Sequence, residues 1–485
     1  MKEKYQKSLK NEIKEIDSFL NDETFEVQHE EPFLINEAII ILKKKPTKNF
    51  IKFNVQLKKA PFPNQFTFKK IGFNNPFSIS NDEKEFTIPT RSANRLTSKR
   101  LATTNECRGT LGKIHSNTFP IKGKSIFRCV REINESGYTV NILGSAYSCD
   151  ETNYSLGLIV LNVNDSVFHL YRHSASDSQY LVFENLDEVE FTEFQRTCRL
   201  SMISMALLKG NWHQNEQFIF SYSDNSFGKI GSVFYESLDK SIISNHELIN
   251  PSQFRTFLKN SDMPSDLTPL FFPEKVLSEI INLQIKAPEY ARTIELLIDG
   301  VGIDSPLIKC SIFHVALETI VGLIYSENKT FFAPIKSSEN LKTIQGEILT
   351  LIKNRENEFN PSEFDSLVKK INYINSPFNK DKFLLAFDIF NIDLPERLKN
   401  LLNTRNKFLH GKTPYKEGQV ESKIKELNSI ADKIHMLTSI LVLKYARYKG
   451  HIKNQAEYKM VMNEFYEEKE LDFPEEERGN IFYRM

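Results

Sequence analysis

The chain has 485 residues, of which 40% are hydrophobic and 26% charged, and its 63 Lys and Arg residues balance its 63 Asp and Glu residues. This length exceeds what one core usually holds, so we expect roughly two to four domains, and the composition excludes a disordered chain. The zero net charge excludes a uniformly basic nucleic-acid-binding surface, so affinity for RNA has to come from local patches.

The first half of the sequence is expected to be rich in β-strands. Short runs of Ile, Val and Phe, separated by polar or glycine-containing breaks, predict strands between about residues 31 and 239. The clearest runs are Phe33–Leu42, Phe50–Leu57, Ser125–Val130, Gly157–Val163 and Phe218–Tyr222. One segment, Glu193–Lys209, instead spaces its apolar residues as a helix does. We interpret residues 1–262 as a β-rich sensing or substrate-selecting domain, built from one or two subdomains.

Two basic clusters in this half are candidate RNA contacts. Lysine and arginine close to aromatic residues, such as Phe50 and Phe53, suit single-stranded RNA because cations follow the backbone while rings stack on bases. The alternative is that these cations form the solvated face of strands. The candidate RNA-binding residues are Lys43, Lys44, Lys45, Arg91, Arg95 and Arg100.

Other motifs are notable for what they exclude. The five cysteines are far apart and form no C-x-x-C pair, which indicates reduced thiols rather than disulfides or a zinc site. The sequence has no P-loop, glycine-rich dinucleotide turn, H-E-x-x-H or G-x-S-x-G motif, so we expect neither a cofactor nor a metal. It also shows no apolar signal region and no run of membrane-spanning length, so we expect a cytoplasmic protein that does not bind membranes.

The second half of the sequence is expected to be helical. Three X-Pro pairs between residues 263 and 273 mark the change, and we assign residues 263–302 to a linker with connecting helices. Asn360 to Glu363 combine a cap, a proline at the first helical position and a glutamate at the third, and Asp393 to Glu396 repeat this pattern. Glu421–Tyr448 is a long amphipathic helix candidate. We assign residues 303–452 to an all-helical domain and residues 453–485 to an acidic C-terminal tail, which makes the fold class α+β.

The helix expected to begin near Asp393 carries the most informative motif. Its apolar face includes Leu398, Leu402 and Phe408, and Arg405 falls on the same face. A guanidinium there has to be paired or lie at an interface, because burying an unpaired charge costs several kcal/mol. Asn406 and His410 are four residues apart at the edge of this face.

The residue types in this motif suit metal-independent cleavage of RNA. Histidine transfers protons near neutral pH, and arginine stabilises the charge that develops on a phosphate. On one helix, however, Arg405 and His410 are about 140° apart around the axis and about 7.5 Å apart along it. A twofold-related second copy could supply the missing side chain. We therefore expect a homodimer with a composite site.

The motif resembles that of HEPN domains, and the arrangement is similar to the ApeA-like HEPN family of bacterial anti-phage proteins. The matching residues are Arg405-Asn406, a three-residue gap and His410-Gly411, on the penultimate long helix of an all-helical domain. A weaker match is Glu318, on the earlier helix Ile312–Ile324, which resembles the acidic position of the family. The resemblance covers about a third of the chain, since we find no family motif in the β-rich half.

The resemblance implies an endoribonuclease that acts by attack of the ribose 2′-OH on the adjacent phosphate. His410 would be the general acid or base, Arg405 would stabilise the phosphorane, and Asn406 would orient His410 or the phosphate. Glu318 would hold Arg405, or else it is only a glutamate on the helix surface, and Lys412 and Tyr415 are candidates to line the same cleft. The products would be a 2′,3′-cyclic phosphate and a 5′-OH.

The predicted function is abortive anti-phage defence by a HEPN ribonuclease that cuts RNA after a phage-derived trigger, with tRNA as one candidate substrate. The alternative is a dimeric binding or sensor protein without catalysis. In that case the helical domain is an interaction module, and Arg405 and His410 serve only its structure.

Overall fold

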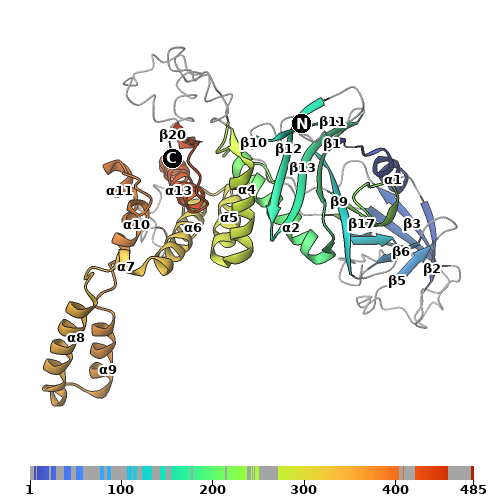
Figure 1. Ribbon diagram of the computed structural model, residues 1–485. Helices are drawn as coiled ribbons and strands as arrows, with labels where there is room; N and C mark the ends of the chain where they lie inside the picture. Colours follow the sequence, from blue (N-terminus) through green and yellow to red (C-terminus); the bar gives the residue numbers. More distant parts are fainter. Residues whose placement is uncertain are drawn as a thin grey trace, which may run out of the picture. The chain divides into compact units, whose positions relative to one another are not determined.

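The computed structural model describes the backbone of residues 5–6, 8–20, 23–28, 38–44, 51–57, 77–80, 85–88, 106–111, 113–116, 123–133, 142–148, 154–175, 178–212, 216–237, 242, 244, 246–250, 271–402, 408, 421–456 and 482–484. The chain divides into two compact units, Met1–Asn282 and Leu283–Met485. The first contains a large sheet and the second is mainly helical, so the predicted α+β class is confirmed (Figure 1).

The centre of the N-terminal unit is a run of antiparallel strands. Their order in the sheet is β12 (Tyr154–Val163), β13 (Ser166–Ala175), β14 (Ser178–Asn185), β9 (Lys124–Ile133), β16 (Glu216–Tyr222) and β17 (Ile230–Ser237). Beyond β12 the sheet continues through β11 (Ser145–Ser148) to β1 (Tyr5–Gln6), and this last pair is parallel. A short strand, β15 (Val189–Glu190), also pairs with β9.

Beyond β17 the same sheet continues through strands from the first quarter of the chain. Their order is β8 (Lys113–Ser116), β6 (Glu85–Ile88), β5 (Phe77–Ser80), β2 (Glu23–Gln28), β3 (Ala38–Lys44), β4 (Ile51–Leu57) and β7 (Glu106–Leu111). Separately, β10 (Ile142–Leu143) pairs with β18 (Phe272–Pro273). The strands expected from the apolar runs are therefore present, although β3 begins at Ala38 and residues 33–37 lie outside the described part.

The two faces of the central strands carry different side chains because successive residues of a strand point in opposite directions. Phe127 of β9 and Phe183 of β14 lie on the face that α2 (Phe191–Lys209) covers, and the ring of Phe194 is 5.2 and 5.4 Å from theirs. This helix was expected over Glu193–Lys209, and it ends at Gly210, whose φ of 75° is one that glycine adopts readily. On the opposite face lies Arg128 of β9, in contact with α1 (Lys10–Leu20).

The core of the C-terminal unit is built on α6 (Pro306–Glu327), which packs against α5 (Pro288–Val301), α13 (Ile424–Tyr445) and α10 (Asn379–Asp388). The Tyr290 hydroxyl of α5 donates to the carbonyl of Val442 in α13 at 2.9 Å. Gly300 of α5 leaves room for the buried ring of Phe313 from α6, because a Cβ at residue 300 would collide with it. These contacts bury one side of α5, whereas α13 is buried on all sides over residues 434–443.

Shorter elements complete this unit. They are α4 (Glu274–Lys286), which crosses the boundary between the units, α7 (Lys329–Phe332), α11 (Glu396–Leu402), the 3₁₀ turns Glu356–Glu358 and Glu421–Lys423, and the paired strands β19 (His451–Lys453) and β20 (Phe482–Arg484).

By length and composition α6 could cross a membrane, and it is the one helix of the described residues for which this holds. Sequence inspection did not anticipate a run of this length. Its buried residues, which include Phe313, Leu317 and Ile320, pack in the helical core against α5 and α13. A core helix buried among other helices satisfies the same length and composition test.

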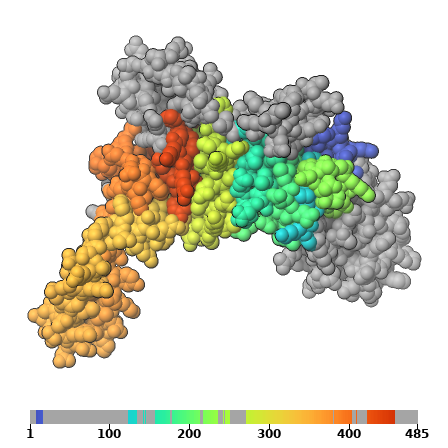
Figure 2. Space-filling view, viewed as in Figure 1, coloured from blue at the N-terminus to red at the C-terminus, as the bar shows by residue number. Residues whose placement is uncertain are grey.

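Two helices, α8 (Ser338–Lys353) and α9 (Pro361–Asn372), form a hairpin that Figure 2 shows projecting from the rest of the helical unit. The predicted start of α9 is confirmed. The Asn360 side chain accepts from the backbone N–H of Glu363 at 2.9 Å, and the Glu363 carboxylate accepts from the N–H of Asn360 at 3.0 Å. Every residue of α8 is described and none is buried, so the hairpin has only a thin apolar core.

Candidate functional site

The predicted catalytic residues Arg405, Asn406 and His410 lie outside the described residues, as do the supporting candidates Lys412 and Tyr415. Between Leu402, the last residue of α11, and residue 421, Phe408 is the one residue that the structure describes. It lies three residues after Arg405 and two residues before His410. Phe408 is therefore the position from which the surroundings of the motif can be examined.

Phe408 is buried against α6. Its ring stacks on that of His314, with centroids 5.4 Å apart and planes inclined by 23°. The hydroxyl of Ser311 lies 3.1 Å from the Phe408 carbonyl oxygen, and it lies equally far from the carbonyl oxygen of Leu307, so it can donate its proton to either. Residues far apart in sequence thus meet at one face of α6.

Glu318 belongs to the same face of α6. Ser311, His314 and Glu318 are spaced by three and four residues, which places them within about 60° around a helix. Glu318 is half-buried and lies one turn beyond His314. Glu318 therefore lies on the α6 face that Phe408 contacts, and its proposed pairing with Arg405 stays a prediction.

The interior next to this face contains further polar groups that sequence inspection did not single out. Asp432 and His435, on α13, are both buried, and the ring of His435 meets that of Phe313 at a centroid distance of 5.0 Å. Burial, together with the charge of Asp432, raises the pKa of the Cys310 thiol to about 12. Cys310 is therefore a protonated thiol at neutral pH and is unsuited to nucleophilic attack.

The candidate RNA contacts in the N-terminal unit are less well defined. Lys43 and Lys44 are the last two residues of β3, and Lys43 is in register with Lys52 of β4. Their side chains, and the whole of Lys45, Arg91, Arg95 and Arg100, lie outside what the structure describes. The proposal that these cations bind RNA stays a prediction.

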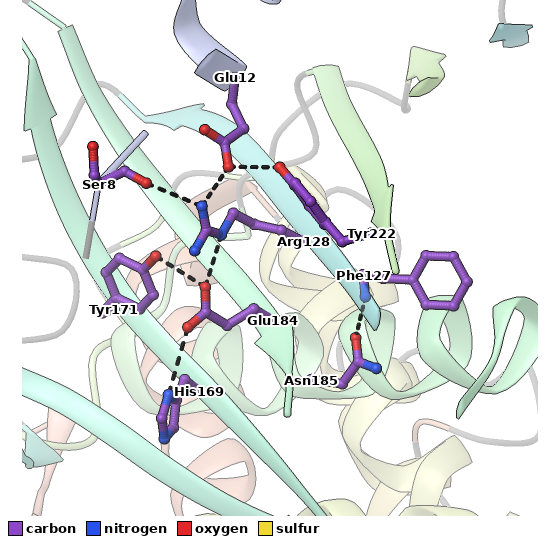
Figure 3. Close-up of polar contacts among 9 residues, drawn as sticks. All are labelled: Ser8, Glu12, Phe127, Arg128, His169, Tyr171, Glu184, Asn185 and Tyr222. Atoms are coloured by element: carbon purple, nitrogen blue, oxygen red, sulfur yellow. Dashed lines mark hydrogen bonds and ion pairs between the residues drawn. The ribbon is translucent and has the colours of Figure 1, made fainter. Parts of the chain in front are cut away.

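A buried charge network occupies one face of the central sheet, and Figure 3 shows its members. The guanidinium of Arg128 donates from Nε to Glu184 at 2.8 Å and from Nη1 to Glu12 of α1. The same Nη1 donates to the carbonyl of Ser8 at 3.0 Å. Arg128 and Glu12 are each 2% exposed and Glu184 is fully buried, so water screens these charges little.

Two tyrosines and a histidine complete the network. The hydroxyl of Tyr222 donates to Glu12 at 2.6 Å and that of Tyr171 donates to Glu184 at 3.1 Å (Figure 3). Nδ1 of His169 lies 3.5 Å from the other oxygen of Glu184. Burial and the neighbouring carboxylates raise the pKa of both tyrosines, which therefore stay neutral donors. The network links α1 to four strands of the sheet, β9, β13, β14 and β16.

The network makes the stability of the N-terminal unit sensitive to acid. Burial, and then the charge of Arg128, lower the pKa of His173, while Glu12 acts in the opposite direction. The unfolded chain therefore binds a proton below about pH 6.5 that the folded chain resists, so this contribution to stability is present above that pH and is lost as the pH falls.

We expect a His173→Gln variant to lose less stability than the wild type when the pH falls from about 7.5 to 5.5. Urea unfolding at both pH values, followed by far-UV circular dichroism, measures the difference. Equal losses in the two proteins would contradict this assignment.

No metal centre is evident, since among the described residues no group of three or more His, Cys, Asp or Glu side chains could hold an ion. Comparison with known proteins gives no identification either: no family model, no curated protein and no solved structure matches the chain.

Proposed function

We propose that the C-terminal unit is a metal-independent endoribonuclease of the HEPN type, with His410 and Arg405 as its catalytic residues. The observation that carries the proposal is the burial of Phe408 against Ser311 and His314 of α6, next to Glu318. In the sequence, Phe408 lies three residues after Arg405 and two residues before His410, and no described residue lies closer to either of them in the chain.

This arrangement supports the division of roles in the proposal. Arg405 precedes Phe408 by one helical turn in the pattern expected from the sequence, and a carboxylate on the facing helix would satisfy its charge. Glu318 supplies a carboxylate on the α6 face that Phe408 contacts. An arginine held in this way is fixed in position to stabilise a phosphorane rather than free to move.

The proposed reaction needs no group outside the protein and the RNA. A base, His410 or its counterpart in a second copy, removes the proton of the 2′-OH, and the oxygen attacks the adjacent phosphorus. The P–O5′ bond breaks, a proton passes to the leaving O5′, and a 2′,3′-cyclic phosphate and a 5′-OH remain. The proposed biological role is abortive anti-phage defence in the cytoplasm, in which a phage-derived trigger activates a homodimer that cuts RNA such as tRNA.

The direct test is incubation of the purified protein with total RNA in the presence of EDTA, followed by mapping of the product ends. We expect cleavage that EDTA does not inhibit and products with cyclic-phosphate ends. The assay is repeated with extract from phage-infected cells, which would supply a missing trigger. Absence of cleavage in both conditions contradicts the proposal and favours a binding or sensor protein.

A further inference from the structure

At the base of the hairpin α8–α9 lie two segments, residues 329–337 and 369–382, which we call the neck; the second includes the end of α9 and the start of α10. The two segments are held together by Asn375, whose side chain accepts from the N–H of Ile335 at 2.7 Å and donates to its carbonyl at 3.0 Å. Gln345 of α8 also donates to the carbonyl of Ile371 at 3.1 Å. The neck is thus an ordered surface and not merely a connection.

The neck exposes large aromatic side chains. Tyr373 is 71% exposed, Phe378 77% and Phe331 43%. Single exposed apolar residues are ordinary on protein surfaces, but a group of them rimmed by polar residues marks an interaction site. The exposed rings of the neck belong to two short segments that Asn375 holds together, so we treat them as candidates for one such site.

The neck is also strongly basic, although the chain as a whole is neutral. Its 23 residues contain six lysines and one acidic residue, Asp381, and it is flanked by Glu327 and Glu339. Two lysines already lie over aromatic rings, Lys336 at 5.5 Å from the centroid of Phe331 and Lys382 at 4.4 Å from that of Tyr325. The neck therefore combines lysines with exposed aromatic rings.

We propose that the neck binds single-stranded RNA, with the lysines on the phosphates and Tyr373, Phe378 and Phe331 stacked on bases. This combination favours a single-stranded polyanion because ring faces stack on any unpaired base while lysines follow the backbone. A protein partner could pack against the rings, but the five excess positive charges would attract it only if its own surface were acidic. The choice of RNA as the ligand rests on the proposed function. The inference adds the surface on which the RNA strand is held.

Binding is measured with the full-length protein and a fluorescein-labelled, 2′-fluoro-substituted oligouridylate, which cannot undergo 2′-OH attack. We expect Tyr373→Ala with Phe378→Ala to weaken binding by about tenfold or more. We expect the double variant Lys369→Gln and Lys370→Gln to depend less on salt. The slope of the logarithm of the binding constant against the logarithm of the salt concentration should become shallower by about 0.7 for each phosphate contact removed. The matched control is Lys353→Gln with Arg355→Gln, two exposed cations at the other end of the hairpin, which should leave affinity nearly unchanged.

Each outcome decides between alternatives. Equal binding by the wild type and the neck variants, or no binding by the wild type, overturns the inference. If the neck variants instead lower the sedimentation coefficient without RNA, the surface is an interface between copies of the chain and the inference is wrong. Because the probe cannot be cleaved, a protein that binds it through the neck but cuts no natural RNA contradicts the proposed ribonuclease and leaves this inference standing.

Discussion

Replacement of His410 by glutamine is expected to lower RNA cleavage by roughly 10²–10⁴-fold, because glutamine keeps the polarity of histidine but cannot transfer a proton near neutral pH. Arg405→Lys should give a loss of similar size, since lysine keeps the charge but not the planar pair of donors that a phosphate accepts. Initial rates on total RNA, with unfolding measured in parallel, separate a catalytic from a structural effect.

The control for these variants is Lys425→Gln. Lys425 is exposed in the first turn of α13, so this variant should cleave RNA as fast as the wild type. If Arg405 and His410 serve only the structure, both variants should unfold more easily and activity should fall only in proportion. Unchanged cleavage in either variant would remove that residue from the mechanism.

A mixing experiment tests whether the site is composite. Arg405→Ala and His410→Ala proteins are each expected to be inactive alone. If one copy supplies the arginine and the other the histidine, a mixed dimer retains one complete site, and subunit exchange should restore roughly a quarter of wild-type activity. If each copy holds its own complete pair, no mixture recovers activity.

The second large effect concerns Arg128. We expect Arg128→Met to destabilise the N-terminal unit by about 3–5 kcal/mol, because it leaves two buried carboxylates, those of Glu12 and Glu184, without their cation. The loss should appear as a lower urea midpoint, and the amides of α1 should exchange with solvent faster because Arg128 holds that helix to the sheet.

Two comparisons make this prediction specific. Lys423→Ala removes an ion pair of 2.8 Å with Glu426 in which both side chains are nearly half-exposed, so it should change stability by less than about 1 kcal/mol. Adding Glu12→Gln and Glu184→Gln to Arg128→Met should restore part of the loss, because neutral amides cost less to bury than unpaired carboxylates. A loss below about 1 kcal/mol in the single variant would show that the network contributes little to stability.

Local patterns accounted well for the types of element. The apolar runs predicted the main strands, and the helical spacing over Glu193–Lys209 predicted α2 to within two residues at its start. The cap at Asn360 was readable because all of its partners lie within three residues. Strand alternation, helical periodicity and capping depend on neighbours in the chain, and these are visible in a sequence.

The charge network was not predicted, because its members are far apart in the chain. Arg128 pairs with Glu12, 116 residues earlier, and with Glu184, 56 residues later. Within β9 alone, Arg128 has the appearance of an outward-facing polar residue. The candidate site is a similar case: the motif around Arg405 and His410 could be read locally, whereas the packing of Phe408 on Ser311 and His314 joins positions nearly 100 residues apart.

The amino-acid sequence by itself therefore determined the α+β class and the positions of several strands and helices, and it supplied the residues of the candidate motif as a prediction. Only the tertiary structure decided that Arg128 is buried with two carboxylates, that Glu318 lies on the α6 face which Phe408 contacts, and that the rings of the neck stay exposed. The physical reason is that helix and strand patterns come from interactions between near neighbours. Burial, in contrast, is set by which distant segments pack together, and no local pattern records that choice.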